Sequence, residues 1–73
     1  MILWKPFGES LIGSSAHIKH CEYSLREIRD IRQYEVRQYW TGRTTKVLLK
    51  CTRAESLEQA KEQANSWDET YER

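Results

Sequence analysis

The 73-residue sequence predicts an α+β domain in which a small antiparallel sheet packs on a C-terminal helix. Two patterns predict this fold class. Apolar residues alternate on both sides of Gly42, which is typical of a β-hairpin over residues 34–51. Apolar residues then recur at steps of three and four, which is the spacing of one helix face over residues 56–72. Because no repeat or linker divides the chain, we expect residues 1–73 to form a single domain.

The start of the helix is predicted from its capping residues. Ser56 and Gln59 have the spacing of a capping box, so the helix should begin near Ser56. Thr52 and Glu55 have the same spacing and would begin it one turn earlier. The stripe expected to face the sheet consists of Leu57, Ala60, Ala64, Trp67 and Tyr71.

The hairpin register follows from the turn. With Gly42 and Arg43 as a two-residue loop, glycine takes the positive φ that a type II′ turn requires. Trp40 then pairs with Thr45 and Val36 pairs with Leu49 on the face toward the helix. The opposite face pairs Glu35 with Lys50 as an ion pair, and Tyr39 with Lys46 as a cation–π contact. The predicted core is Val36, Trp40, Val47, Leu49, Leu57, Ala60, Ala64 and Trp67.

The N-terminal third is less regular. Residues 1–7 alternate as a short strand, in which Pro6 suits the edge of a sheet. Residues 8–10 have turn composition, and residues 11–12 can begin a returning strand before the loop or bulge composition of residues 13–15.

Residues 24–33 leave two alternatives. Apolar residues recur every three positions from Leu25 to Ile31, which favours a short helix over 24–33. However, no Gly, Pro or Asn separates this segment from the strand that starts at Tyr34. A long bent strand from Tyr23 is therefore the alternative.

The net charge of +1 hides an asymmetry along the chain. Residues 1–53 hold ten Lys and Arg against five Asp and Glu, whereas residues 54–73 hold two against six. Sheet and helix should therefore carry opposite charge. This can simply keep the two layers complementary and soluble, or it can offer a basic sheet face to an acidic partner.

No cluster has the spacing of a catalytic, metal or cofactor site. Zinc usually requires two paired ligand spacings, and the chain has only one half of such a set; a disulfide is disfavoured because nothing indicates an oxidising compartment. Neighbouring serines and a histidine lack an orienting carboxylate and an oxyanion hole. We predict a non-enzymatic, cytoplasmic protein without a membrane span. The residues weighed for this chemistry are Ser14, Ser15, His17, His20, Cys21 and Cys51.

The outward face of the hairpin is the predicted binding site. It combines positive charge with an exposed aromatic residue, a composition common at nucleic-acid and acidic-protein interfaces. The alternative is that residues 1–33 pack on this face and cover it. The candidate binding residues are Arg32, Arg37, Tyr39, Arg43, Lys46 and Lys50.

The run Ala54 to Lys61 after a hairpin resembles the strand-to-helix junction of very small phage-encoded proteins. Among these are certain type I-F anti-CRISPR proteins and the small phage inhibitors of host RNA polymerase. The resemblance covers residues 34–66. It implies a protein, encoded by a phage or mobile element, that inhibits a host protein or ribonucleoprotein complex by occupying a surface on it.

A second resemblance is to the sheet-plus-helix arm-binding domains of phage-type integrases, which lay a sheet face in the DNA major groove. It implies a DNA-binding module in which Arg37, Arg43 and Lys46 contact phosphates or base edges. The net charge of +1 is low for a chain dedicated to DNA. DNA binding is therefore the alternative to an inhibitor of a host complex.

Overall fold

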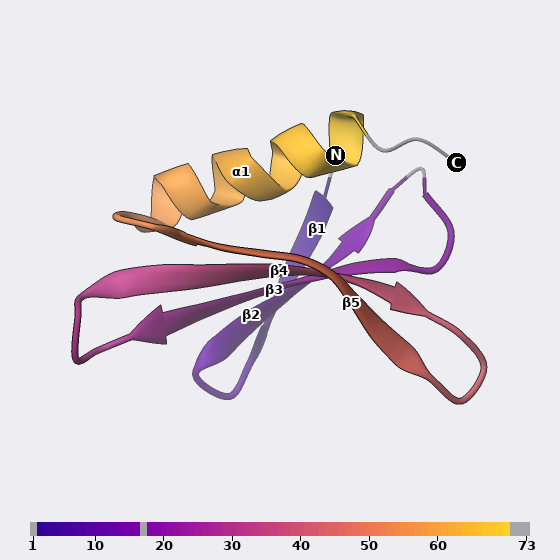
Figure 1. The fold of residues 1–73 in the computed structure, drawn as a ribbon, viewed down its shortest axis with the longest axis horizontal. Helices are drawn as coiled ribbons and strands as arrows, with labels where there is room; N and C mark the ends of the chain where they lie inside the picture. Colours follow the sequence, from indigo (N-terminus) through magenta and orange to yellow (C-terminus); the bar gives the residue numbers. More distant parts are fainter. Residues whose placement is uncertain (1, 17, 71–73) are drawn as a thin grey trace.

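The computed structural model describes residues 2–16 and 18–70. Within them the chain forms a five-stranded sheet and then one helix (Figure 1), and each strand pairs antiparallel with the next, in the order β1-β2-β3-β4-β5. The predicted α+β class, with an antiparallel sheet and a C-terminal helix, is confirmed. The elements are β1 (Ile2–Phe7), β2 (Ser10–Ser15), β3 (Cys21–Ile28), β4 (Gln33–Thr41), β5 (Lys46–Ala54) and α1 (Leu57–Glu69).

Helix α1 begins where its cap predicts. The backbone N–H of Gln59 donates to Ser56 Oγ at 3.2 Å, while Gln59 Oε1 accepts from the backbone N–H of Glu55 at 3.3 Å. The earlier start is wrong, because Thr52 belongs to β5. The helix ends at Glu69 rather than at residue 72, since Thr70 is its C-cap; Tyr71 lies outside the described residues.

Residues 24–28 are strand and residues 29–32 form a turn, so the predicted short helix is wrong. The alternative of one long bent strand from Tyr23 holds only as far as Ile28, because the turn separates β3 from β4. β3 ends at Ile28, and a turn with Arg32 at φ 52° leads into β4. Within β3 the buried side chains are Cys21, Tyr23 and Leu25, every second residue. Such alternation places them on one face of a strand, whereas a helix would scatter them around its axis.

The β4–β5 hairpin exists, but the predicted register is wrong. Thr41 pairs with Lys46, so the connection spans residues 42–45. Further along, Tyr39 pairs with Leu48 but Gln38 pairs with Lys50, which leaves Leu49 as the extra residue of a β-bulge. A bulge inserts one residue into one strand, and alternation in the sequence does not reveal it.

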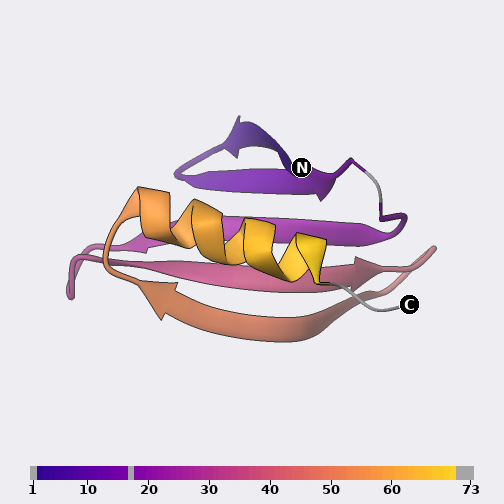
Figure 2. The ribbon, with the colours of Figure 1, turned by 90° about the horizontal axis from the view of Figure 1, so that it is seen from above.

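The hydrophobic core lies between α1 and the sheet. It buries Ala60 and Ala64 of α1 against β1, β3 and β4, and Trp67 packs at its margin. Four predicted core residues are wrong: Trp40, Val47, Leu49 and Leu57 are 40%, 47%, 44% and 36% exposed. The reason is topological, because β5 is an edge strand and the helix lies over β3 and β4 (Figure 2). The observed buried cluster is Ile2, Ile18, Cys21, Tyr23, Leu25, Val36, Ala60 and Ala64.

A buried polar network joins the end of α1 to the sheet. Tyr23 Oη donates to Asp68 Oδ1 at 3.1 Å and accepts from Gln38 Nε2 at 3.0 Å. Gln38 and Asp68 are each only 1% exposed, so this network fixes the helix position through specific atoms. Burial, together with the nearby Cys21 thiol, raises the pKa of Tyr23 well above its usual value.

Candidate binding face

The sheet has a second face, away from α1, that we call the outer sheet face. The N-terminal strands extend the sheet sideways rather than folding over it, and among the described residues no second layer covers this face (Figures 1 and 2). The predicted alternative, in which residues 1–33 cover the face, is therefore wrong for the described residues. By register the face comprises Leu3, Lys5, Phe7, Ser10, Ile12, Ser14, Glu22, Ser24, Arg26, Ile28, Gln33, Glu35, Arg37, Tyr39, Thr41, Lys46, Leu48, Cys51 and Arg53.

Large apolar side chains stand exposed on the outer sheet face. Phe7 is 75% exposed, Leu3 58% and Leu48 49%. Short serines of β2 and β3 lie between these longer side chains, and a shallow cavity of about 380 Å³ opens there between Phe7 and Lys46. Exposed apolar residues around a hollow are typical of a docking surface.

The charged residues of this face form one connected array. Lys46 Nζ lies 2.8 Å from Glu22 Oε1 and 4.6 Å from the centre of the Tyr39 ring. Arg37 Nη1 donates to Tyr39 Oη at 3.3 Å, and its Nη2 lies 2.7 Å from Glu35 Oε1. The contact between Tyr39 and Lys46 confirms the predicted cation–π pair. The predicted ion pair of Glu35 with a lysine of β5 is wrong, because Glu35 pairs with Arg37.

This array orients side chains more than it stabilises the fold. Ion pairs at a protein surface each contribute about 0–1 kcal/mol. The hydrogen bond to Tyr39 and the carboxylate of Glu35 raise the pKa of Arg37, which stays charged. Arg37 Nε is buried and has no hydrogen-bond partner among the described residues. The guanidinium is thus held in place on a face that carries aromatic and apolar groups beside it.

The six predicted binding residues do not form one site. Arg37, Tyr39 and Lys46 lie together on the outer sheet face, whereas Lys50 lies on the helix side, with Nζ 5.8 Å from the centre of the Trp67 ring. The other two lie beyond opposite ends of β4, which at about 3.3 Å per residue places them roughly 30 Å apart. They are Arg32 in the β3–β4 turn and Arg43 in the β4–β5 loop.

Sequence reasoning missed the contribution of β1 to this face. Leu3, Lys5 and Phe7 line its margin, and Arg26 of β3 adds an ion pair to Glu35 at 3.9 Å. The alternation of β1 was visible in the sequence. What the sequence did not show was which set of alternate residues would turn away from the helix.

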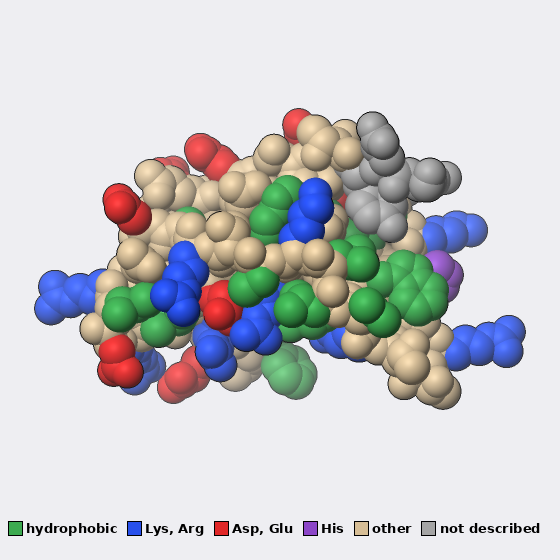
Figure 3. All heavy atoms as spheres, in the orientation of Figure 1, with side chains coloured by type: hydrophobic (Ala, Val, Ile, Leu, Met, Phe, Trp, Pro, Cys, Tyr) green, Lys and Arg blue, Asp and Glu red, His purple; other side chains and the backbone are tan. Residues whose placement is uncertain are grey.

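Charge separates between the two layers as the sequence predicts. The outer sheet face carries more cations than anions, whereas most acidic residues after position 54 belong to α1. Figure 3 shows acidic side chains over the helix and Lys and Arg side chains concentrated along the sheet. The outer-face cations are Lys5, Arg26, Arg37, Lys46 and Arg53, and the anions are Glu22 and Glu35.

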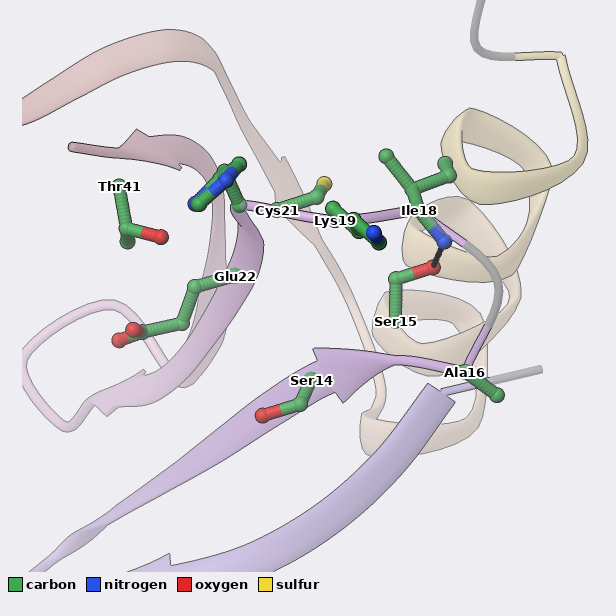
Figure 4. Close-up of a pocket in the computed structure, with 9 residues that line it drawn as sticks. Ser14, Ser15, Ala16, Ile18, Lys19, Cys21, Glu22 and Thr41 are labelled. Carbon is green, nitrogen blue, oxygen red and sulfur yellow. Dashed lines mark hydrogen bonds between the residues drawn. The ribbon is translucent and has the colours of Figure 1, made fainter.

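A cavity of about 460 Å³ lies at the end of the sheet beside the β2–β3 connection (Figure 4). Ser15 Oγ accepts from the backbone N–H of Ile18 at 3.0 Å, so this hydroxyl shapes the turn. In Figure 4 the side chains of Ser14 and Glu22 point away from the helix side, whereas the side chain of Cys21 points toward it. Burial raises the pKa of the Cys21 thiol, which disfavours the nucleophilic thiolate.

Within the described part of the chain, the cysteines form no disulfide and the possible ligands form no metal-binding cluster. Cys21 and Cys51 are both free thiols, on β3 and β5, with β4 between them. Among the described residues, His, Cys, Asp and Glu do not gather in any group of three that could hold a metal ion. The candidate ligand His17 lies outside the described residues.

Comparison with protein families, curated proteins and solved structures finds no match. In the part of the chain that the structure describes, α1 is too short and too polar to cross a membrane.

Proposed function

We propose that this chain is a non-enzymatic binding protein whose outer sheet face docks on a host macromolecular complex and blocks it, as small phage-encoded inhibitors do. The observation that carries the proposal is the uncovered face itself. It presents Leu3 and Phe7 beside an oriented array of cationic and aromatic groups. Arginine and aromatic residues are enriched at protein interfaces, where they supply most of the binding energy.

An acidic protein surface with apolar residues at its centre fits this face. The cavity between Phe7 and Lys46 can receive an apolar side chain, while the rim cations Lys5 and Lys46 meet carboxylates. Because Lys46 and Arg37 already contact Glu22 and Glu35, their positions are set before binding, which lowers the entropy lost on association. The outer sheet face is therefore preorganised for binding to a protein surface.

DNA binding is the second candidate, and the gathering of cations on one layer favours it. The basic face could follow a phosphate backbone, as the integrase resemblance implies. However, Glu22 and Glu35 lie at the centre of the same face and would approach phosphates. A salt titration separates the two functions, since binding through several phosphates weakens steeply between about 50 and 200 mM salt.

The test uses two pairs of truncations. Leu3→Ser with Phe7→Ser alters the outer sheet face, and Ile31→Ser with Leu57→Ser removes exposed apolar groups elsewhere. If the proposal holds, a bacterial complex retained by the wild-type chain binds the outer-face variant at least about tenfold more weakly and binds the control variant unchanged.

Three results would refute the proposal. The first is equal retention of the complex by both variants. The second is a chain that retains no host protein at all. The third is steeply salt-dependent binding of the wild-type chain to a fluorescently labelled DNA duplex of random sequence, together with loss of this binding in the outer-face variant. That result would establish DNA as the partner instead.

A further inference from the structure

The two edges of the sheet differ in their capacity to accept another strand. An edge strand leaves alternate backbone N–H and C=O groups unpaired. β1 has six residues and contains Pro6, which lacks a backbone N–H. β5 has nine residues and no proline. The β5 edge is therefore the longer and better equipped of the two for strand addition.

The side chains of β5 are exposed and carry one sign of charge. Val47, Leu48 and Leu49 are 47%, 49% and 44% exposed. The strand contains three cations and no acidic residue. Arg53 lies on the outer sheet face and Lys50 on the helix side, so a strand added at this edge would meet positive charge on both faces.

We propose that the edge of β5 binds an acidic, extended segment of a partner protein by strand addition. The charge of β5 selects this occupant. A second copy of the chain would bring Lys and Arg of two β5 strands close together, and like charges on adjacent strands are unfavourable. Edge lysines oppose self-pairing for this reason, yet the same lysines attract a strand that carries Glu or Asp. This edge is a surface separate from the Leu3 and Phe7 side of the outer sheet face.

The bulge at Leu49 divides the available edge. On one side lie residues 46–48 and on the other residues 50–54. The second stretch is longer and contains both Lys50 and Arg53. We therefore expect the partner strand to pair chiefly with residues 50–54.

The experiment titrates the ¹⁵N-labelled chain with a nine-residue peptide in which pairs of glutamates alternate with pairs of valines, a pattern that puts carboxylates on both faces. Two control peptides are used: one replaces glutamate by lysine, and the other keeps the sequence but has N-methyl groups along its backbone. Backbone amides are followed by chemical shift and by hydrogen exchange. We expect shifts and slowed exchange at residues 50–54, not in β1, and about tenfold weaker binding of both controls.

Protein variants test the charge requirement. Lys50→Glu with Arg53→Glu should lower affinity for the acidic peptide about tenfold. Lys19→Glu with Arg29→Glu makes the same net charge change at exposed positions outside β5 and should leave affinity unchanged. The outer-face variant Leu3→Ser with Phe7→Ser should also bind the peptide normally, so failure of the docking function and failure of strand addition are distinguishable.

The proposal is overturned by any of three results. Equal binding of the N-methylated peptide would show attraction by charge without strand pairing. Equal binding of the lysine peptide would show that charge does not select the occupant. A dimer in solution whose contact protects the β5 amides of the free chain would show that a second copy occupies the edge.

Discussion

Replacing Tyr23 by phenylalanine removes one oxygen atom from the interface between α1 and the sheet. That oxygen accepts a hydrogen bond from Gln38 Nε2 and donates one to Asp68 Oδ1. The aromatic ring remains, so its packing against the core is kept. The variant therefore isolates the contribution of the two buried hydrogen bonds.

The magnitude follows from burial. Gln38 and Asp68 are each 1% exposed, so water does not readily replace the lost partner. Removing one partner from a buried hydrogen bond costs about 1–3 kcal/mol. We expect Tyr23→Phe to lower the free energy of unfolding by about 2–3 kcal/mol. A domain of this size has a total of about 4–11 kcal/mol, so the loss is large.

Urea denaturation followed by tryptophan fluorescence and circular dichroism measures this loss. For a domain of this length the melting temperature should fall by about 8–24 °C. Tyr34→Phe is the matched control, because its hydroxyl donates to Glu27 Oε2 at 3.5 Å in an exposed position and should contribute less than about 0.5 kcal/mol. Equal effects of the two substitutions, or a loss below about 0.5 kcal/mol at Tyr23, would refute the reasoning.

Three further predictions concern stability. Because burial raises the pKa of Tyr23, the hydroxyl of this residue loses its proton near pH 10 in the unfolded chain but only at higher pH in the folded chain. The free energy of unfolding should therefore fall by about 1.4 kcal/mol per pH unit above pH 10. Denaturation between pH 9 and 11 should show this slope in the wild type and a smaller one in Tyr23→Phe. Gly13→Ala would place a Cβ 2.5 Å from Ile2 Cγ2 and 2.7 Å from the Trp4 ring. Thermal unfolding should therefore show a loss of about 1–3 kcal/mol in the free energy of unfolding. A loss below about 0.3 kcal/mol would mean that β1 shifts away from the added methyl group at little cost. Ser56→Ala should cost about 1 kcal/mol in urea denaturation through loss of the helix cap, and Ser56→Asp should restore most of it; no difference between these two variants would contradict the capping role.

The helix could be predicted from the sequence because its signals are local. The cap depends on Ser56 and Gln59, three residues apart, and the apolar stripe follows from the helical period. By contrast, the spacing of Leu25, Ile28 and Ile31 imitated a helix although the three residues have different surroundings. Leu25 is buried beneath α1, Ile28 lies near the end of β3, and Ile31 is 46% exposed in the turn.

The hairpin register and the extent of the candidate site depended on structural features that the sequence does not show. The bulge at Leu49 shifts all pairs beyond it by one residue, so Lys50 lies on the helix side beside Trp67. A clearer signal in β3 was available, since polar residues alternate with Cys21, Tyr23 and Leu25. Period-two alternation of this kind is the signature of a half-buried strand.

The exposed apolar residues of the outer sheet face are not explained by folding. Helix α1 has 13 residues and is therefore about 20 Å long and about 10 Å wide, which is enough to cover part of one face of the sheet. In the described chain, burying the second face would require another layer of similar size. Leu3 and Phe7 nevertheless stand there, 58% and 75% exposed. Since large apolar side chains in water favour association, their exposure supports the docking function proposed for this face.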